Sequence, residues 1–97
     1  MIGLCATLKA QSGKEKELET ILRGMVENAK RETGTWHYIL HTADDDPRTF
    51  FFYEQYVDSA ALDFHGSTDY FRREFGKAEE LLSEPATIAT FKVLTAK

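Results

Sequence analysis

The chain has 97 residues, a hydrophobic content of 42% and a formal net charge of −4 at pH 7. A chain of this length forms one small domain, and its 12 basic residues are interspersed with 16 acidic ones, which argues against the cationic surface that nucleic-acid binding requires. No apolar run approaches the roughly 18 residues of a membrane-spanning helix, and no linker or signal segment is recognisable, so we expect a single cytoplasmic domain over residues 1–97 that binds no membrane.

The N-terminal third of the chain predicts a strand followed by a helix. Apolar and polar residues alternate from Ile2 to Lys9, and this period of two indicates a strand. The single Cys5 can form no internal disulfide, and we expect it to fill space in the core. Ser12 and Glu15 have the spacing of a capping box, which predicts that a helix begins there. The apolar residues of this helix share one face: Leu18, Ile21, Leu22, Met25, Val26 and Ala29.

Two further strands are predicted after this helix. Gly34 is expected to end the helix as a left-handed cap, and a strand pattern resumes from Trp36 to Thr42. Residues 43–48 are rich in turn formers, and the most aromatic run of the chain, Phe50 to Val57, predicts the next strand. Apolar residues occur at both parities of that strand, so both of its faces need cover, whereas helices on one side of a sheet cover only one.

The C-terminal part predicts two short helices and a last strand. Asp58 or Ser59 can cap a helix through Phe64, Ser67 or Thr68 can cap a second one, and residues 86–95 form a strand. The second helix is expected to carry Phe71, Phe75, Ala78 and Leu82. This order predicts an α+β ferredoxin-like split βαβ fold (βαββαβ), an antiparallel four-stranded sheet with helices on one face. The bare apolar face predicts a homodimer with two sheets back to back, a dimeric α+β barrel.

Several short motifs, taken in chain order, resemble the antibiotic biosynthesis monooxygenase (ABM) domain. They are Ser12-Gly13-Lys14-Glu15, Gly34-Thr35-Trp36-His37-Tyr38, Tyr53-Glu54-Gln55-Tyr56, and Ala61-Leu62 followed by His65, Ser67 and Phe71. The resemblance covers nearly the whole chain and implies a dimeric α+β barrel. Some members oxidise quinols or anthrones with O2 without metal or flavin, whereas others degrade haem or isomerise small molecules. The resemblance therefore implies the fold more directly than the activity.

The chain departs from the family pattern at two positions. Tyr56 stands where relatives often have Trp, and Tyr70 stands where they often have His, so the resemblance implies a more phenolic pocket than usual. The haem-degrading branch uses an Asn on the first strand and a His in the last helix. Residues 2–9 and 71–83 contain neither, so this chain is less similar to that branch.

Oxidation by O2 without a cofactor requires a substrate that donates an electron itself once it is deprotonated. Reduced quinones, anthrones and related polyphenolic aromatics meet this requirement. The protein then has to supply a base, a donor for the resulting oxyanion and a cavity with little water. Histidine suits the role of base, because its reference pKa of ~6.5 leaves it largely neutral yet basic at physiological pH.

His65 is the first candidate for this base, because it follows Phe64 at a helix end and lies close in sequence to Tyr70 and Phe71. Its alternative role is to cap the helix or to bind a loop carbonyl. Glu54 alternates with Phe52 and Tyr56 on one strand face, so its carboxylate is either buried and paired, for instance with an Arg, or directed into a cavity. The tyrosines Tyr38, Tyr53 and Tyr56 can donate to an oxyanion or serve as core aromatics. The residues expected to bind the substrate are Tyr38, Glu54, Tyr56, Phe64, Tyr70 and Phe71.

The remaining histidines and acidic residues do not predict a metal site. His37 and His41 are about 13 Å apart along one strand, too far to share a metal ion. Residues 44–46 are three Asp without the pattern of an EF-hand, and a turn is expected there. We therefore expect a cofactor-free homodimeric monooxygenase that oxidises a quinol, an anthrone or a similar polyphenol with O2. Two alternatives stay open: a non-catalytic barrel that binds a small molecule, and an isomerase of a small oxygenated metabolite that uses the same His and Tyr residues.

Overall fold

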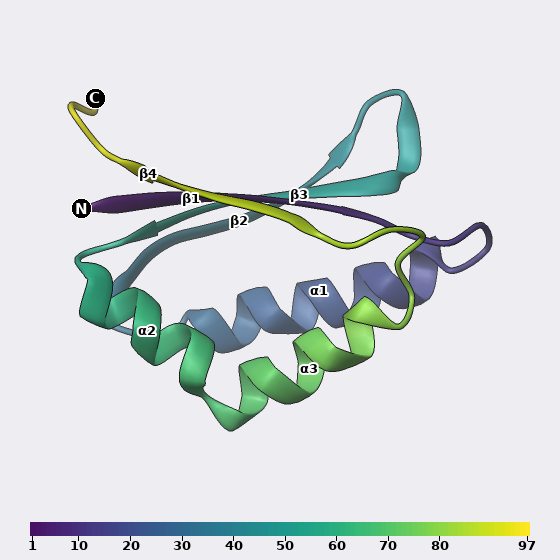
Figure 1. Cartoon of the computed structure of the whole chain (residues 1–97), viewed down its shortest axis with the longest axis horizontal. Helices are drawn as coiled ribbons and strands as arrows, with labels where there is room; N and C mark the ends of the chain where they lie inside the picture. Colours follow the sequence, from purple (N-terminus) through teal and green to yellow (C-terminus); the bar gives the residue numbers. More distant parts are fainter.

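The computed structural model describes residues 1–97, and all three of its helices lie on one side of the sheet (Figure 1). The elements are β1 (Ile2–Lys9), α1 (Glu15–Ala29), β2 (Thr35–Ala43), β3 (Asp46–Tyr56), α2 (Ser59–Ser67), α3 (Asp69–Glu79) and β4 (Thr87–Lys92). The four strands pair antiparallel in the order β2-β3-β1-β4. This arrangement confirms the predicted ferredoxin-like βαββαβ fold, in which α2 and α3 together form the second helical segment. None of the helices combines the length and the apolar character that crossing a bilayer demands.

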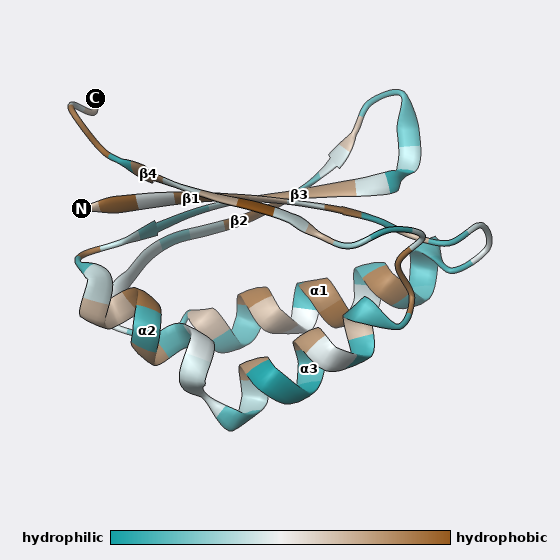
Figure 2. Ribbon diagram, viewed as in Figure 1, coloured by the Kyte–Doolittle hydropathy of each residue, from teal (hydrophilic) through white to brown (hydrophobic).

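The core fills the space between the sheet and the helices. Hydrophobic stretches run along β1 and β3 and occur on α1 (Figure 2). The predicted apolar face of α1 is confirmed, because Leu18, Leu22, Met25 and Ala29 are buried while Ile21 and Val26 are partly buried at its margin. The sheet contributes the alternate residues that face the helices: Leu4, Ala6 and Leu8 from β1, and Phe50, Phe52 and Tyr56 from β3. On each of these two strands, side chains of one parity therefore form the sheet's part of the core.

No helix covers the opposite face of the sheet (Figure 1). One row of paired residues crosses this face from Ile39 through Tyr53 and Cys5 to Ala89. Ile39 is 45% exposed, and Phe91 on the same face is 56% exposed. Cys5 is half-buried here and is not part of the core, so its predicted place was wrong. We call this side of the sheet the open face.

The start of α1 differs from the prediction. Ser12 caps nothing, because the helix begins at Glu15 with Lys14 at the N-cap and without a side-chain cap bond. The backbone N–H of Lys14 donates to the carbonyl of Gln11 at 3.0 Å, and Gly13 has φ = 85°. A positive φ at the third residue is what a type II turn requires, so Ser12 lies inside a tight turn that precedes the helix.

The predicted left-handed cap at Gly34 was also wrong. Helix α1 ends at Ala29 with Lys30 in the right-handed region, and Gly34 has no positive φ. A Cβ atom at Gly34 would lie 2.6 Å from the Cβ of Ala61 in α2. Glycine is therefore needed here for close packing, because it lets α2 approach the loop that leads into β2.

The remaining helices and strands lie where the sequence predicts them, but the ends of several of them differ. Two candidate caps were predicted for each of the last two helices. Asp58 accepts from the N–H of Ala61 and is the cap of α2, and Thr68 accepts from the N–H of Phe71 and is the cap of α3. Several element ends differ from the prediction: α2 continues past Phe64 to Ser67, α3 ends at Glu79 before Leu82, and β4 is shorter than residues 86–95. The expected turn at residues 43–48 shrinks to 44–45, since β3 already begins at Asp46.

Candidate active site

His65 lies in the last turn of α2, and its side chain is buried between the helical layer and the sheet at 5% exposure. Three aromatic rings surround the imidazole. The ring centroids of Tyr38, Tyr56 and Phe71 lie 5.1, 5.4 and 4.8 Å from that of His65. The cap at Asp58 and the close approach of α2 to Gly34 fix the helix that carries this histidine.

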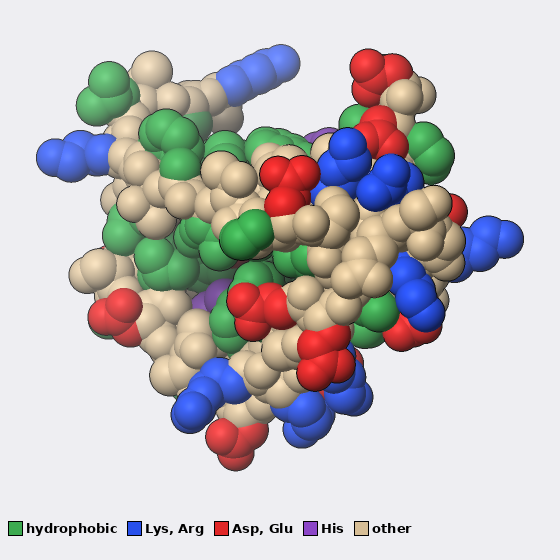
Figure 3. Space-filling model, turned by 45° about the vertical axis from the view of Figure 1, so that its right-hand side comes forward, with side chains coloured by type: hydrophobic (Ala, Val, Ile, Leu, Met, Phe, Trp, Pro, Cys, Tyr) green, Lys and Arg blue, Asp and Glu red, His purple; other side chains and the backbone are tan.

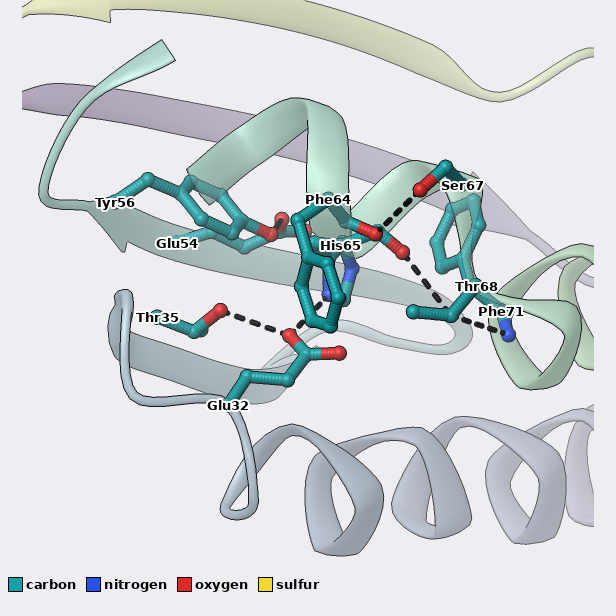
Figure 4. A network of polar contacts seen from close by, with 9 residues as sticks. All are labelled: Glu32, Thr35, Glu54, Tyr56, Phe64, His65, Ser67, Thr68 and Phe71. Carbon is teal, nitrogen blue, oxygen red and sulfur yellow. Dashed lines mark hydrogen bonds and ion pairs between the residues drawn. The ribbon is translucent and has the colours of Figure 1, made fainter. Parts of the chain in front are cut away.

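One nitrogen of the imidazole is held by a carboxylate. The Nδ1 atom of His65 lies 2.7 Å from Oε1 of Glu32, in the loop between α1 and β2 (Figure 4). The Glu32 side chain is only 7% exposed, and the hydroxyl of Thr35 donates to the same Oε1 at 2.8 Å. An ionised carboxylate only accepts hydrogen bonds, so Nδ1 carries the hydrogen and, in the neutral imidazole, Nε2 is left with a free lone pair.

The second nitrogen, Nε2, is buried and has no hydrogen-bond partner in the protein. His65 lines a largely apolar cavity of about 90 Å³ between the sheet and the helices. Hydrophobic side chains line a hollow between these two layers (Figure 3). The lining residues are Leu4, Ala6, Leu8, Met25, Tyr38, Phe52, Glu54, Leu62, His65, Gly66, Phe71, Phe75 and Ile88. Leaving a buried polar atom unpaired costs free energy, so a polar group of a ligand in this cavity would find a partner in Nε2.

Glu54 is buried on β3, where it lines the cavity and accepts a hydrogen bond from Tyr56 Oη at 2.5 Å. Both predicted alternatives therefore apply to its carboxylate, although its partner is a tyrosine and not the suggested arginine. Burial raises the pKa of Glu54 from 4.5 to about 7 against the opposing effect of the Tyr56 hydrogen bond, and the charge of Glu32 adds to the rise. Burial thus moves the titration of Glu54 from the acidic range toward neutral pH.

The two tyrosines beside His65 keep their protons. Burial raises the pKa of Tyr38 far above its usual range, and the charges of Glu54 and Glu32 add to this rise. Burial likewise raises the pKa of Tyr56, and Glu54 contributes through its charge and its hydrogen bond. Tyr38 lines the cavity and its hydroxyl has no protein acceptor among the hydrogen bonds, so it is the phenol available to donate to a bound oxyanion.

The structure brings together some of the predicted site residues and not others. His65, Tyr38, Glu54 and Phe71 line the cavity, whereas Tyr56 does not line it and is connected to it by the hydrogen bond to Glu54. Phe64 is 59% exposed and borders a different depression, because successive helical residues point about 100° apart. For the same reason Tyr70 diverges from Phe71 and packs against α1, where its hydroxyl approaches Gly24. His37 and His41 are exposed on β2, outside the cavity.

Sequence reasoning missed Glu32 and Thr35. Glu32 lies in the loop that enters β2, and Thr35 is the first residue of that strand. Glu32 is separated from His65 by 33 positions. The one available signal was a carboxylate two residues before the Gly34-Thr35 motif. A larger open groove of about 580 Å³ lies between α1 and β2, but it has the charged residues Glu19, Arg23 and Glu27 in its wall. It contains no buried atom that lacks a partner, so the cavity at His65 is the candidate site.

Comparisons with known proteins identify one family model and several similar proteins. The family model described as antibiotic biosynthesis monooxygenase matches residues 1–77. The Bacillus subtilis protein named "Putative monooxygenase YcnE" is 32% identical over 88 residues, which cover 91% of this chain and 93% of that protein. The solved structure of PA3566 from Pseudomonas aeruginosa has a TM-score of 0.88 at 35% identity, covering 97% of this chain and 94% of that one. The Synechocystis protein sll1783 is 28% identical over 95% of this chain, which spans only 63% of that relative's length.

Proposed function

The chain belongs to the antibiotic biosynthesis monooxygenase family, and we propose that it is a homodimeric, cofactor-independent monooxygenase that oxidises a quinol, an anthrone or a similar polyphenolic aromatic with O2. The observation that carries this proposal is the buried His65, whose Nδ1 is held by Glu32 and whose unpaired Nε2 belongs to a side chain lining an apolar cavity. This arrangement presents a base to a substrate in a site with little water.

His65 starts the reaction by accepting the acidic proton of the substrate on Nε2. The imidazolium that results is stabilised by the Glu32 carboxylate at 2.7 Å. The negative charge of the substrate then lies on its oxygen, to which the hydroxyl of Tyr38 donates a hydrogen bond. Donors that are already oriented in a site with little water stabilise such a charge strongly, because they need no reorganisation during the reaction.

The deprotonated substrate supplies the electrons that O2 needs. One electron passes to O2, and the resulting superoxide combines with the substrate radical to form a C–O bond and a peroxide anion. In an anthrone, the peroxide carbon then loses its remaining hydrogen as a proton while the O–O bond breaks. The imidazolium of His65 returns its proton to the distal oxygen, so that hydroxide departs. This hydroxide takes up the proton lost by the carbon and becomes water. Anthrone and O2 thus give anthraquinone and water, and the histidine returns to its neutral state.

The cavity suits O2 and part of an aromatic substrate. Its volume of about 90 Å³ exceeds that of a diatomic gas, while sites for larger ligands usually measure ~300–1000 Å³. Ile88 of β4 belongs to its wall and is 53% exposed, so the cavity lies close to the surface. We expect one ring of the substrate to be inserted next to His65 and the remaining rings to lie toward this exposed side.

The homodimer is supported by the open face. Ile39 and Phe91 are large apolar side chains about half-exposed on one side of the sheet, and a second copy of this face would bury them. Light scattering at micromolar concentration is expected to give the mass of a dimer. The substitution Ile39→Lys is expected to give a folded monomer, because it places a charge in the proposed buried contact. A wild-type monomer at these concentrations would rule out this part of the proposal.

Oxygen uptake tests the proposed reaction. Chelator-treated protein is mixed with freshly reduced quinols and anthrones, and O2 consumption is compared with autoxidation. We expect uptake to be well above autoxidation in the wild type, to collapse in His65→Ala and to persist in Asp63→Ala, an exposed control on the same helix. No enhancement with any substrate would contradict the oxygenase. Ligand-dependent thermal stabilisation without turnover would then favour a binding barrel, and conversion of an oxygenated metabolite without O2 would favour an isomerase.

A further inference from the structure

Glu32 lies between two separate spaces. The inner one is the cavity lined by His65, and Glu32 does not take part in its wall. The outer one is a surface depression of about 340 Å³ lined by Glu32, Thr33, Gly34, Thr35, Ala60, Ala61 and Phe64. The two sets of lining residues have no member in common. The hydrogen bond between Nδ1 of His65 and Oε1 of Glu32 therefore joins one space to the other.

The two oxygens of Glu32 have different surroundings. Oε1 accepts from His65 and from Thr35, whereas Oε2 makes no hydrogen bond within the protein. Oε2 is also not among the buried atoms that lack a partner, so it keeps contact with solvent. Glu32 lines the outer depression, so we infer that this contact is made there. One carboxylate thus touches the buried imidazole with one oxygen and external water with the other.

No other titratable group near His65 contacts both the buried imidazole and the solvent of the outer depression. From β2 the imidazole faces Tyr38, and from β3 it faces Tyr56 with its partner Glu54. The two tyrosines keep their protons, and Glu54 is bonded to Tyr56 and makes no bond to the imidazole. From α3 the nearest ring is Phe71, which cannot carry a proton. A proton on the imidazole can thus reach water by way of Glu32 without crossing the substrate cavity.

We propose that Glu32 is the positioning residue of His65 and that the outer depression is the route by which the buried base exchanges its proton with water. The proposal rests on the proposed function and deepens it. When the product carries a hydroxyl group and leaves as its phenolate, the proton of that hydroxyl stays on the imidazole, which the reaction had returned to its neutral state. That proton passes from Nδ1 to Oε1, which restores a neutral imidazole and gives a carboxylic acid. The acid then releases the proton to water in the outer depression and becomes a carboxylate again.

The first test is made on the resting protein and needs no substrate. The ¹⁵N chemical shifts of the His65 imidazole are compared in the wild type, in Glu32→Ala and in the exposed control Asp63→Ala, after circular dichroism has shown that each variant is folded. We expect the wild type and the control to carry the hydrogen on Nδ1 and Glu32→Ala to populate both tautomers. Added formate, which fits the space vacated by the carboxylate, is expected to restore the Nδ1–H form. An unchanged tautomer in Glu32→Ala would overturn the positioning role.

The route is tested by blocking it. Ala60 is exposed in the wall of the outer depression and does not line the cavity, so Ala60→Phe narrows the depression alone. In the Glu32→Ala background, Ala60→Phe is expected to lower the effect of formate on the His65 tautomer at least severalfold. Full restoration of the Nδ1–H form by formate in this double variant would overturn the outer route. If the wild type oxidises none of the substrates, the proposed function fails while both NMR experiments still decide this inference.

If the wild type is active, the kinetics provide a further readout. Glu32→Ala is expected to lower kcat by about 10–100-fold, the range found for groups that orient a catalytic ligand, while KM changes little because Glu32 does not touch the substrate cavity. Formate is expected to recover part of kcat in Glu32→Ala and none in His65→Ala. A wild-type kcat in Glu32→Ala would overturn the inference.

Discussion

The two faces of the sheet are built from alternate residues of the same strands, yet only one of them is completed within the chain. On the helix-covered face, Leu8, Phe50 and Tyr56 are almost entirely buried. On the open face, Ile39 and Phe91 remain 45% and 56% exposed. The difference shows that one chain supplies enough helix to finish a single face. The other face has apolar residues without cover, and the homodimer that we propose would provide it.

The helix-covered face contains both the hydrophobic core and the candidate site. Glu54 and His65 are buried in it beside a core that is otherwise apolar. Burying such groups costs free energy unless each polar atom is paired, and Nε2 of His65 is not. The large hydrophobic core around them offsets this cost. The open face contains no comparable buried group without a partner, so the candidate site lies on the covered face alone.

The largest expected effect is the contrast between a core residue and an open-face residue. Leu22 is fully buried in α1, and Leu22→Ala is expected to lower the free energy of unfolding by about 2–5 kcal/mol, as deletions in a packed core do. Ile39→Ala removes a half-exposed side chain, and we expect a loss below about 1 kcal/mol per chain where the protein is monomeric. Urea unfolding at several protein concentrations separates the two contributions. Equal losses at the lowest concentration would contradict the difference between the faces.

The second prediction concerns the buried carboxylate of the covered face. The pKa of Glu54 is raised from 4.5 to about 7 on folding, so the native state binds more protons than the unfolded state between these values. The contribution of Glu54 to stability is then fully present below pH 4.5 and is lost as the pH rises through 7, by up to about 3 kcal/mol. Glu54→Gln removes this loss, so its stability relative to the wild type should increase from pH 4.5 to 8.

Urea unfolding across this pH range measures the effect. Since Glu54→Gln leaves the other titratable groups in place, the difference between the two proteins isolates this carboxyl. The variant Tyr56→Phe removes the hydrogen bond that lowers the pKa of Glu54, and it should shift the fall in stability to higher pH. Parallel pH profiles of Glu54→Gln and the wild type would show that Glu54 titrates in the native state as it does when unfolded.

Features set by neighbours in sequence could be predicted, and features set by contacts across the fold could not. The alternation in Ile2–Lys9 and the apolar face of α1 are local patterns, and both occur where expected. The role of Gly34 depends on Ala61 in another element. The sequence therefore indicated that this position needs a glycine, but the expected reason, a left-handed helix cap, was wrong. Ser12 failed as a cap because the tight turn at Gly13 moves the start of the helix beyond its reach.

The site shows the same division. Glu54 and Tyr56 alternate on one strand, so their shared face was predictable, and the hydrogen bond between them follows from it. The family motif singled out His65. The carboxylate that holds its imidazole comes from a loop 33 positions away, and no periodic pattern connects the two. Only the packing of α2 against this loop brings them to 2.7 Å.

The third prediction tests that packing. Gly34→Ala places a Cβ 2.6 Å from the Cβ of Ala61, so α2 has to move away from the loop. Overpacking of this kind costs about 1–3 kcal/mol. Because α2 carries His65, the hydrogen bond to Glu32 should also lengthen and the ¹⁵N signal of Nδ1 should shift. A variant with wild-type stability and an unchanged imidazole signal would show that the loop adapts without moving the helix.

The smallest expected effect is a gain in stability from Gly76→Ala in α3. Gly76 lies inside a helix with no positive φ, and a Cβ atom there would meet no other atom within 4 Å. Alanine loses less conformational entropy than glycine when a helix forms, so the free energy of unfolding should rise by about 0.5–1 kcal/mol. Thermal and urea unfolding measure this gain. Helix α3 lies on the covered side of the sheet, and its contacts are made within one chain. The gain should therefore be the same at every protein concentration. A gain that grows with concentration would mean that the outer surface of α3 also contacts a second copy, and the open face would then not be the only surface that a partner covers.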